Sequence, residues 1–396
     1  MEAELEKLEQ RRSLPLTHEL MGIIFDFYVH LYGQIPERLL LVCRAWHVLA
    51  ISQPTLWTNL DPLGPFGLRT VRPWAGTFLQ SRIARSNPAP LKVDFSRWSQ
   101  STIQNDAKRI AGIRTFRSRI QELVITSSQE WNYLIGSQPL LKHLTIGGRV
   151  YALDELRKNP APYMLSEKTI TTLCVRCPQE MHIWPESLLR RLQTLEVTLP
   201  GIHGDHECWS MVQRSVALLT LHVTVSFMNA PPLSHASCRS LTITCCDSQC
   251  SVEEIRMPRL QELTIDTYGS NALMRLTLVD TSVSSLRLTR KMGPFQDIHQ
   301  VERASWVAGA IRLLRLTPRL ERFEISASFD LVDSLSEAIA EKPNLCMELN
   351  TFIVDRPMAL TLGATSYTKN VEANFEQLTS KISALLDQRR RFKELA

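Results

Sequence analysis

The sequence predicts an α/β protein in three parts: a short all-helical N-terminal segment, a curved parallel sheet built from irregular repeats, and a C-terminal helix. Three observations predict this fold class. Apolar residues between Leu20 and Ala50 recur in steps of three and four, as they do on amphipathic helices. Beyond Leu123 a short apolar motif recurs at the spacing of a repeat protein. Between Val371 and Phe392 the apolar residues follow a heptad-like pattern.

Composition and charge are those of an ordinary globular protein. The 396 residues are 44% hydrophobic and 21% charged, and the net charge of +5 is too mild to predict a nucleic-acid-binding domain. The longest apolar stretch, Leu20 to Leu31, is interrupted by polar residues and is shorter than the roughly 18 residues of a membrane span, so we expect no membrane partner. Residues 1–13, predicted to form a charged helix, lack the features of a signal peptide. With nine cysteines in no framework spacing, we expect reduced thiols and a cytoplasmic or nuclear location.

Two short helices are predicted in the N-terminal segment. The first carries one apolar stripe that we expect to be buried, formed by Leu20, Ile23, Ile24, Phe27, Tyr28 and Leu31. Gly33 ends it, and Pro36 suits the first turn of a second helix. The apolar face of the second helix comprises Leu39, Val42, Cys43, Trp46, Leu49 and Ala50, and Pro54 ends it before a short hydrophobic turn. Helices this short cannot bury so much apolar surface against each other, so we expect a second surface in the same chain or on a partner.

Four segments in this region carry a family resemblance. They are Leu16 to Leu20 (LTHEL), Ile24-Phe25, Leu40 to Trp46 (LLVCRAW) and Pro54 to Trp57 (PTLW). Together they resemble an F-box, in particular the large F-box group of mushroom-forming fungi. The most specific part is Val-Cys-Arg-x-Trp followed by Pro-x-Leu-Trp. The family usually begins Leu-Pro, whereas Thr17 stands here where the proline belongs. A helix over Trp74 to Ser86, followed by Pro-Leu and a strand, also resembles this group.

The resemblance implies a function without chemistry of its own. F-box helices dock on the Skp adaptor of a cullin–RING ubiquitin ligase, and the rest of the chain presents a substrate protein. By position, the residues that match the docking and packing residues of the family are Leu16, Leu20, Ile24, Leu40, Val42, Cys43, Trp46 and Trp57. Sequence alone does not separate the two roles. The alternative is a helical cap that only covers the first repeat behind it.

The repeated motif is an apolar residue, two further residues, leucine, one residue and a second apolar residue. Its central positions are Leu123, Leu144, Leu173, Leu195, Leu221, Leu241, Leu263, Leu276, Leu286, Phe323 and Phe352. Most successive gaps fall within the ~20–29 residues of a leucine-rich repeat. Because Leu276 and Leu286 are too close for two repeats, we expect Leu276 to begin an extra strand. The interpretation is one short strand per repeat with the leucines in a shared core; the alternative is an ordinary mixed sheet.

These patterns divide the chain into five segments. Residues 1–13 form the charged helix, 14–60 the F-box, 61–88 a linker and helix, 89–370 the leucine-rich-repeat-like domain, and 371–396 a C-terminal amphipathic helix. The last repeat of such a domain has no neighbour, so the C-terminal helix is expected to cap it. A coiled-coil contact with another chain is the alternative.

A search for catalytic and metal-binding motifs predicts neither an enzyme nor a cofactor. Cys174-x-x-Cys177 has the spacing of a zinc half-site, but no second pair completes a tetrahedral set, so no metal is expected. No phosphate-binding loop, dinucleotide fingerprint, nucleophile elbow or ligase cysteine array is present.

Residues between the inward leucines are expected on the face of the sheet where a partner binds. These outward positions include Thr145, Arg176, Glu196, His222, Thr242, Thr264, Asp266, Arg287, Arg290 and Glu324. We take Arg176, Glu196, Asp266 and Arg287 as candidate substrate-binding residues, because charges of mixed sign favour a protein partner. The leading hypothesis is therefore a substrate-recruiting adaptor that binds the Skp adaptor and, through it, a cullin–RING ligase. The alternative is a repeat scaffold that acts outside any ubiquitin ligase.

Overall fold

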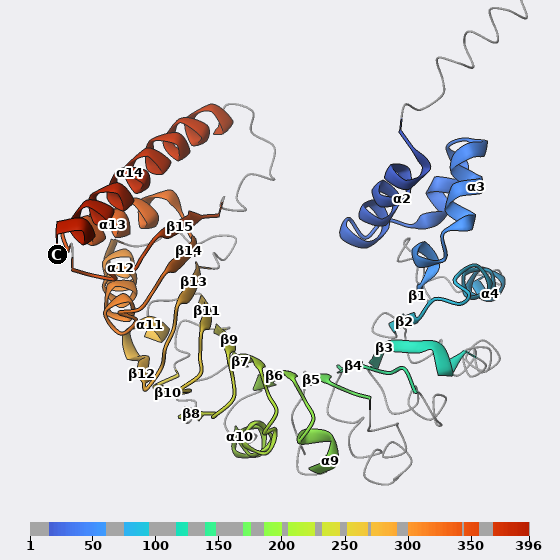
Figure 1. Cartoon of the computed structure of the whole chain (residues 1–396), viewed down its shortest axis with the longest axis horizontal. Helices are drawn as coiled ribbons and strands as arrows, with labels where there is room; N and C mark the ends of the chain where they lie inside the picture. The colour runs from blue at the N-terminus through green and yellow to red at the C-terminus, as the bar shows by residue number, and fades with distance from the viewer. Residues whose placement is uncertain are drawn as a thin grey trace, which may run out of the picture. The chain divides into compact units, whose positions relative to one another are not determined.

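The computed structural model describes residues 16–60, 75–94, 116–125, 139–147, 169–175, 186–199, 205–225, 232–245, 252–267, 271–290, 300–342, 344–355 and 367–395. The chain forms two compact units, residues 1–170 and 171–396 (Figure 1). It is an α/β structure in which twelve strands make one parallel sheet in the order β1-β2-β3-β4-β5-β6-β7-β9-β11-β13-β14-β15. The predicted residues 1–13 lie outside the described part.

The first unit begins with five helical elements. They are α2 (His18–Asp26), the π-helical turn η1 (Phe27–Leu31), the 3-10 helix η2 (Pro36–Leu41), α3 (Arg44–Ser52) and the 3-10 turn η3 (Pro54–Trp57). As predicted, Gly33 ends the first helical stretch, in the left-handed conformation at φ 61°, and Pro36 opens the next. The core of this part consists of Met21, Phe25, Val29, Leu39, Ala50, Leu56 and Trp57.

The predicted second helix is wrong as a continuous element. Its chain direction changes at Cys43, whose φ of −160° and ψ of 169° are those of extended backbone. A 3-10 helix ends just before this point and α3 begins just after it. Val42 and Cys43 therefore sit at a corner between two helices and not on the face of one, which leaves both exposed.

The rest of the first unit places strands next to one another in parallel. The elements are β1 (Asn59–Leu60), α4 (Ala75–Arg85), β2 (Leu91–Asp94), η4 (Arg117–Arg119), β3 (Ile120–Ile125) and β4 (His143–Ile146). Leu60 lies opposite Val93, Val93 opposite Leu123, and Leu123 opposite Leu144. The strand predicted around Leu91 and Val93 is thus confirmed, with both side chains buried.

The second unit contains the remaining strands of the long sheet and the elements that connect them. Its elements are β5 (Thr172–Val175), α9 (Glu186–Leu189), β6 (Thr194–Leu199), α10 (Asp205–Arg214), β7 (Thr220–Val225), β8 (Leu233–Ser234), β9 (Ser240–Cys245), β10 (Glu254–Arg256), β11 (Glu262–Thr267), α11 (Asn271–Arg275), β12 (Thr277–Val279), β13 (Ser285–Arg290), α12 (Gln300–Arg315), β14 (Arg322–Ser326), α13 (Phe329–Ala340), β15 (Thr351–Val354) and α14 (Tyr367–Leu395).

The register confirms the predicted repeat positions. The central residues lie opposite one another on successive strands, in the order Leu173, Leu195, Leu221, Leu241, Leu263, Leu286, Phe323 and Phe352. All of them are buried. Because side chains alternate along a strand, one such position in register fixes the inward face of the whole sheet.

The extra strand expected after Leu276 is also confirmed. It is β12, which lies outside the long sheet and forms a small parallel sheet in the order β12-β10-β8. Figure 1 shows these three strands on the opposite side of the core from β9, β11 and β13. The buried Leu233 and Ile255 close the core there, so a strand replaces a helix in these segments.

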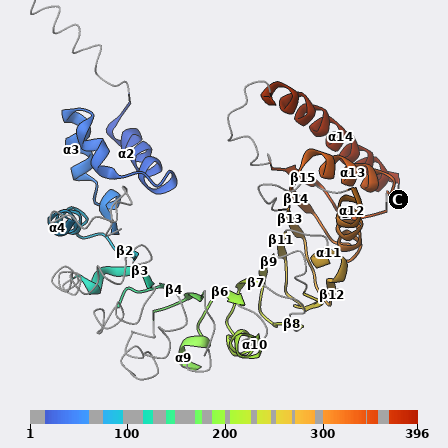
Figure 2. The same ribbon diagram turned by 180° about the vertical axis from the view of Figure 1, so that it is seen from behind.

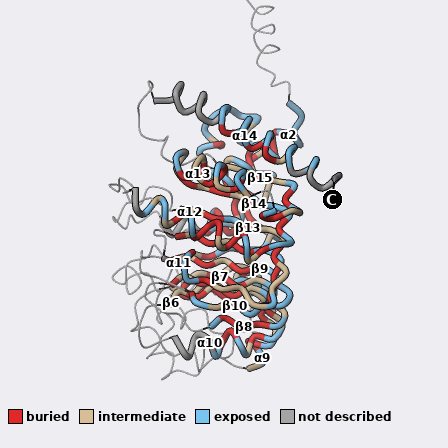
Figure 3. Tube along the Cα trace, turned by 90° about the vertical axis from the view of Figure 1, so that its left-hand side faces the viewer, coloured by how far each residue is buried: buried red, intermediate tan, exposed pale blue. Residues whose placement is uncertain are grey.

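Helices cover the later strands of the second unit. Figures 1 and 2 show α11, α12 and α13 together on one side of β11, β13, β14 and β15. Gly309 allows α12 to approach α11 closely, since a Cβ atom there would lie 2.8 Å from the Cβ of Leu273. Buried segments, red in Figure 3, occur both in the strands and in the helices that cover them.

The C-terminal helix packs on its own chain. Leu378, Ile382 and Leu385 of α14 are buried, and Lys381 Nζ lies 2.6 Å from Asp333 Oδ1 on α13. The described part of α14 therefore contacts α13 and β15, the last strand of the long sheet, which is where the predicted cap would lie.

A buried histidine lies between β8 and β9. His235 Nε2 donates to the carbonyl oxygen of Ser215 at 3.0 Å, and Nδ1 accepts from the backbone N–H groups of Ser237 and Cys238 at 3.4 and 3.2 Å. Burial lowers the pKa of His235, against a smaller opposite effect of the Ser215 hydrogen bond. A proton on Nδ1 would also face two N–H donors, so the neutral form suits this site.

We expect His235 to make the second unit less stable in acid. Because its pKa in the folded state lies below the unfolded value of about 6.5, its contribution is complete above pH 6.5 and is lost as pH falls toward the lowered pKa. Hydrogen-exchange protection of the amides in β7 and β9, compared between the wild type and His235→Gln from pH 7.5 to 5, tests this, since the other histidines are common to both proteins. The wild type should lose more stability over this range than the variant; equal losses would contradict the prediction.

Candidate functional site

The N-terminal helix α2 begins with a side-chain cap. Thr17 has φ −65° and ψ 159°, and its Oγ1 accepts a hydrogen bond from the backbone N–H of Leu20 at 3.3 Å. This φ is the value that proline fixes. Thr17 therefore has the backbone conformation that proline would impose, and its hydroxyl accepts a capping hydrogen bond that a proline, with no side-chain oxygen, cannot accept. The helix therefore starts at a defined residue, with Leu20 in its first turn and Leu16 just before the cap.

The apolar stripe predicted to be buried on this helix is instead largely exposed. Leu20, Ile23 and Phe27 are 48%, 51% and 55% exposed, and Ile24 and Leu31 are exposed as well. The buried positions are Met21, Phe25 and Val29. Both sets are apolar and both fit a helix, so the periodicity predicted the helix correctly and its buried face wrongly.

The π-helical turn explains why residues four apart share the buried face. On an α-helix of 3.6 residues per turn, positions separated by four drift steadily around the axis. The wider turn of η1, with Tyr32 N–H donating to the carbonyl of Phe27 at 3.1 Å, offsets that drift. Val29 thus returns to the side of Met21 and Phe25, and Phe27 and Leu31 stay on the solvent side.

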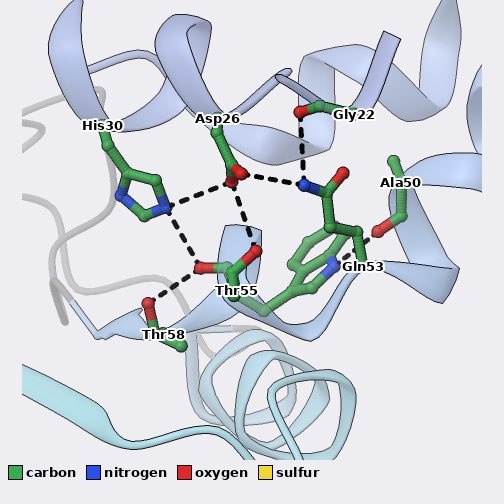
Figure 4. A network of polar contacts seen from close by, with 8 residues as sticks. Gly22, Asp26, His30, Ala50, Gln53, Thr55 and Thr58 are labelled. Carbon is green, nitrogen blue, oxygen red and sulfur yellow. Dashed lines mark hydrogen bonds and ion pairs between the residues drawn. The ribbon is translucent and has the colours of Figure 1, made fainter. Parts of the chain in front are cut away.

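A polar network fixes this helix against the turn that follows α3 (Figure 4). Asp26 accepts hydrogen bonds from Gln53 Nε2 at 3.0 Å and Thr55 Oγ1 at 3.2 Å. Gln53 Nε2 also lies 3.2 Å from the carbonyl oxygen of Gly22, and His30 Nε2 lies 3.1 Å from that of Thr55. These contacts join residues 22–30 to residues 53–55, so the exposed stripe is presented on a fixed helix.

The elements after the first helix extend the exposed apolar surface. Leu41, Val42, Val48 and Ile51 are exposed. Eleven of the fifteen large apolar side chains that are exposed in the described part of the chain lie between residues 16 and 51. The set, which we call the N-terminal apolar surface, comprises Leu16, Leu20, Ile23, Ile24, Phe27, Leu31, Tyr32, Leu41, Val42, Val48 and Ile51. Apolar groups gathered in this way mark an interaction surface.

The eight residues taken from the resemblance fall into two groups. Leu16, Leu20, Ile24, Val42 and Cys43 are exposed. Leu40 and Trp46 are partly buried against the core, with the ring centroids of Trp46 and Phe25 4.9 Å apart.

Trp57 belongs wholly to the core. It is 0% exposed, and its Nε1 donates to the carbonyl oxygen of Ala50 at 2.8 Å. Its role in this chain is packing. Sequence reasoning did not select Leu41, Val48 and Ile51, which the structure leaves exposed.

The candidate substrate residues lie on the outward face of the long sheet, except Arg176, which falls outside the described residues. Glu196 is on β6, and Asp266 and Arg287 are on the neighbouring strands β11 and β13. Arg287 Nη1 lies 3.0 Å from Glu324 Oε1, and its Nη2 lies 2.8 Å from Asp355 Oδ2. The structure therefore brings Arg287 together with two carboxylates, and β7 and β9 lie between Glu196 and the strand of Asp266.

Arg290 does not lie on the outward face, and its predicted placement is wrong. Its side chain is 3% exposed, because it shares the inward parity of Leu286 and Leu288 on β13. Arg290 Nη2 lies 3.4 Å from Glu302 Oε2 on α12. Desolvation lowers the pKa of Arg290, against smaller opposing effects of Glu302.

Within the described residues, no three histidine, cysteine or acidic side chains are grouped as metal ligands. Cys174 is buried on β5, and Cys177 lies outside the described part. Among the helices that the structure describes, none combines the length and apolar character needed to cross a membrane.

Comparison with known proteins leaves the family open. No protein-family model matches this chain, and no curated protein matches it either.

Proposed function

We propose that residues 14–60 are an F-box that binds the Skp adaptor of a cullin–RING ubiquitin ligase, and that the repeats behind it, of the leucine-rich type, recruit the substrate. The observation that carries the proposal is the N-terminal apolar surface. Five of the eight positions that match the F-box pattern are exposed, and four of these are apolar members of this surface. The chain itself then supplies recognition, and the ligase supplies the chemistry.

A physical argument supports a protein partner at this surface. Fully burying a large apolar side chain is worth about 1.5–3 kcal/mol, so eleven exposed ones represent a large unused driving force. The helices that carry them are held by a packed core and by the Asp26 network. A fixed surface loses little conformational entropy on binding, which favours affinity.

The outward face of the sheet is the proposed substrate surface. Near its end, Arg287, Arg322, Glu324 and Asp355 form a cluster of balanced charge in which Arg322 Nη2 lies 3.4 Å from Glu324 Oε2. Because the charges of the cluster balance, it recognises a partner by where the partner's charges lie and not by an overall electrostatic attraction. A protein substrate with complementary mixed charges fits it.

Co-purification of the full chain with the Skp adaptor tests the proposal. Val42 is 57% exposed, so Val42→Asp should leave the fold unchanged, yet it would put a carboxylate into an apolar interface. We expect at least about 100-fold weaker binding. The matched control is Val216→Asp, since Val216 is 61% exposed in the second unit and should not affect adaptor binding.

Two outcomes would contradict the proposal. One is a wild-type chain that does not bind the adaptor, which would favour a repeat scaffold outside the ligase. The other is equal binding by Val42→Asp and Val216→Asp. Circular dichroism spectra that match the wild type would confirm that both variants are folded.

A further inference from the structure

A groove of about 700 Å³ is lined by residues of α12 and α13 and by Lys342 just beyond α13. Figure 1 shows these two helices on the same side of the strands of the second unit. The groove is lined by Arg303, Ala304, Val307, Ala308, Ile311, Arg315, Ser334, Ala338 and Lys342. It uses none of the residues of the N-terminal apolar surface or of the outward face of the sheet. Its volume lies within the range of ligand sites in proteins.

Small apolar side chains make this groove. Ala304 and Ala308 on α12 are exposed, and Ala338 on α13 is partly exposed. Val307 and Ile311 on α12 add larger apolar side chains to the lining. Because alanine side chains are too short to fill the space above two packed helices, the groove keeps an apolar floor of residues from both helices.

Cationic side chains lie at both ends of the groove, and their contacts differ. At one end Arg303 is already held, with Nη2 2.8 Å from the carbonyl oxygen of Asp330 and 2.6 Å from Ser334 Oγ. At the other end Arg315 is exposed and Lys342 is partly exposed. In the part of the chain that the structure describes, no ion pair engages either of these two. This end therefore has positive charge available for a partner.

We propose that this groove binds a short acidic helical segment of a partner protein, with leucine-like side chains on the alanine floor and carboxylates beside Arg315 and Lys342. The choice of an acidic segment follows from charge complementarity with Arg315 and Lys342. The choice of a helix follows from the groove, which is lined by two helices and has small apolar side chains on both. Recognition of an amphipathic helix in a hydrophobic groove is a common mode. This inference is independent of adaptor binding at the N-terminal surface.

A second explanation for the two cations must be separated from this one. Arg315 ends α12 and Lys342 follows the end of α13. Cations at helix C-termini are favoured by the helix dipole without any partner. If that is their only role, reversing their charge lowers stability and does not change peptide binding.

Fluorescence anisotropy of the full chain with a labelled peptide tests the proposal. The probe is a helical peptide with leucines three and four residues apart and glutamates between them; its matched forms carry glutamine or lysine in place of glutamate. The glutamate peptide should bind most tightly. The double variant Arg315→Glu, Lys342→Glu should weaken its binding by about tenfold or more and improve binding of the lysine peptide.

Two further variants keep the test specific. Arg319→Glu reverses an exposed arginine that does not line the groove, and it should change affinity less than twofold. Ala308→Leu fills the floor and should weaken all three peptides alike. No binding of the glutamate peptide, equal effects of Arg319→Glu and the double variant, or an unchanged affinity in Ala308→Leu would overturn the proposal. If the double variant does not fold, the milder variant Arg315→Gln, Lys342→Gln replaces it. That variant should bind the glutamate peptide at least threefold more weakly than the wild type does.

Discussion

Replacing Trp57 with alanine is expected to destabilise the N-terminal helical part by about 3–5 kcal/mol. The side chain is fully buried among Phe25, Leu39 and Leu56, and its indole N–H holds the carbonyl oxygen of Ala50 at the end of α3. The Cζ atom of Arg85 lies 4.6 Å from the centre of the ring, which adds a cation–π contact. Removing the ring leaves a cavity, an unpaired carbonyl and an uncovered arginine.

Hydrogen exchange of the amides in α2 and α3 is the measurement suited to this variant. The chain has two units, so a single global unfolding free energy is not well defined. Trp306→Ala is the matched control, since Trp306 is equally buried in the second unit and should lower protection around α12 alone. If Trp57→Ala left protection in α2 and α3 at wild-type values, the described core would be wrong. Adaptor binding should weaken with the loss of protection.

The register of the long parallel sheet could be predicted in detail from the sequence. Leu195, Leu221, Leu241 and Leu263 occupy equivalent places on successive strands, and each lies opposite the next. A position inside a stacked sheet must be apolar in every repeat, so spacing along the chain reports register in space. The same reasoning identified the strand after Leu276 as an outlier, because two central positions ten residues apart leave no room for a return connection.

The buried face of the first helix could not be predicted from periodicity. Leu20, Ile23 and Phe27 form one stripe, and Met21, Phe25 and Val29 form another, and both are apolar. When two stripes are apolar, the pattern identifies a helix but does not say which stripe meets its own core. The expectation of a second surface did follow correctly from the sequence, because the total apolar area exceeded what two short helices can bury.

Charged residues show the limit of local patterns most clearly. Arg290 was counted among the outward positions, although it shares the inward parity of Leu286 and Leu288 on β13. Its partner Glu302 comes from a helix that begins ten residues later. Contacts between side chains that are distant in the chain produce no periodic pattern in the sequence. The ion pair of Glu37 and Arg82, which are 45 residues apart, is a second example.

The second large effect is expected at this ion pair. Arg82 Nε and Nη2 each lie 2.7 Å from a carboxylate oxygen of Glu37, and Nη1 donates to the carbonyl oxygen of Asn59 at 3.1 Å. The side chains are 5% and 19% exposed. Glu37→Ala removes the carboxylate that contacts both Nε and Nη2 of this buried guanidinium, and it should destabilise the first unit by about 3 kcal/mol. Hydrogen exchange of the amides in η2 and α4 measures this loss.

A double variant distinguishes two effects of Glu37→Ala: the loss of the negative charge beside Arg82 and the loss of the contact itself. In Arg82→Met, Glu37→Met both charges are gone and apolar side chains fill the space, so most of the stability should return. Adaptor binding should return with it, because neither residue belongs to the N-terminal apolar surface. A double variant as unstable as Glu37→Ala would mean that the geometry of the pair, which joins η2 to α4 and β1, matters more than its charge. The cost of Glu37→Ala should also change little between low and high salt, since a buried pair is screened far less than an exposed one.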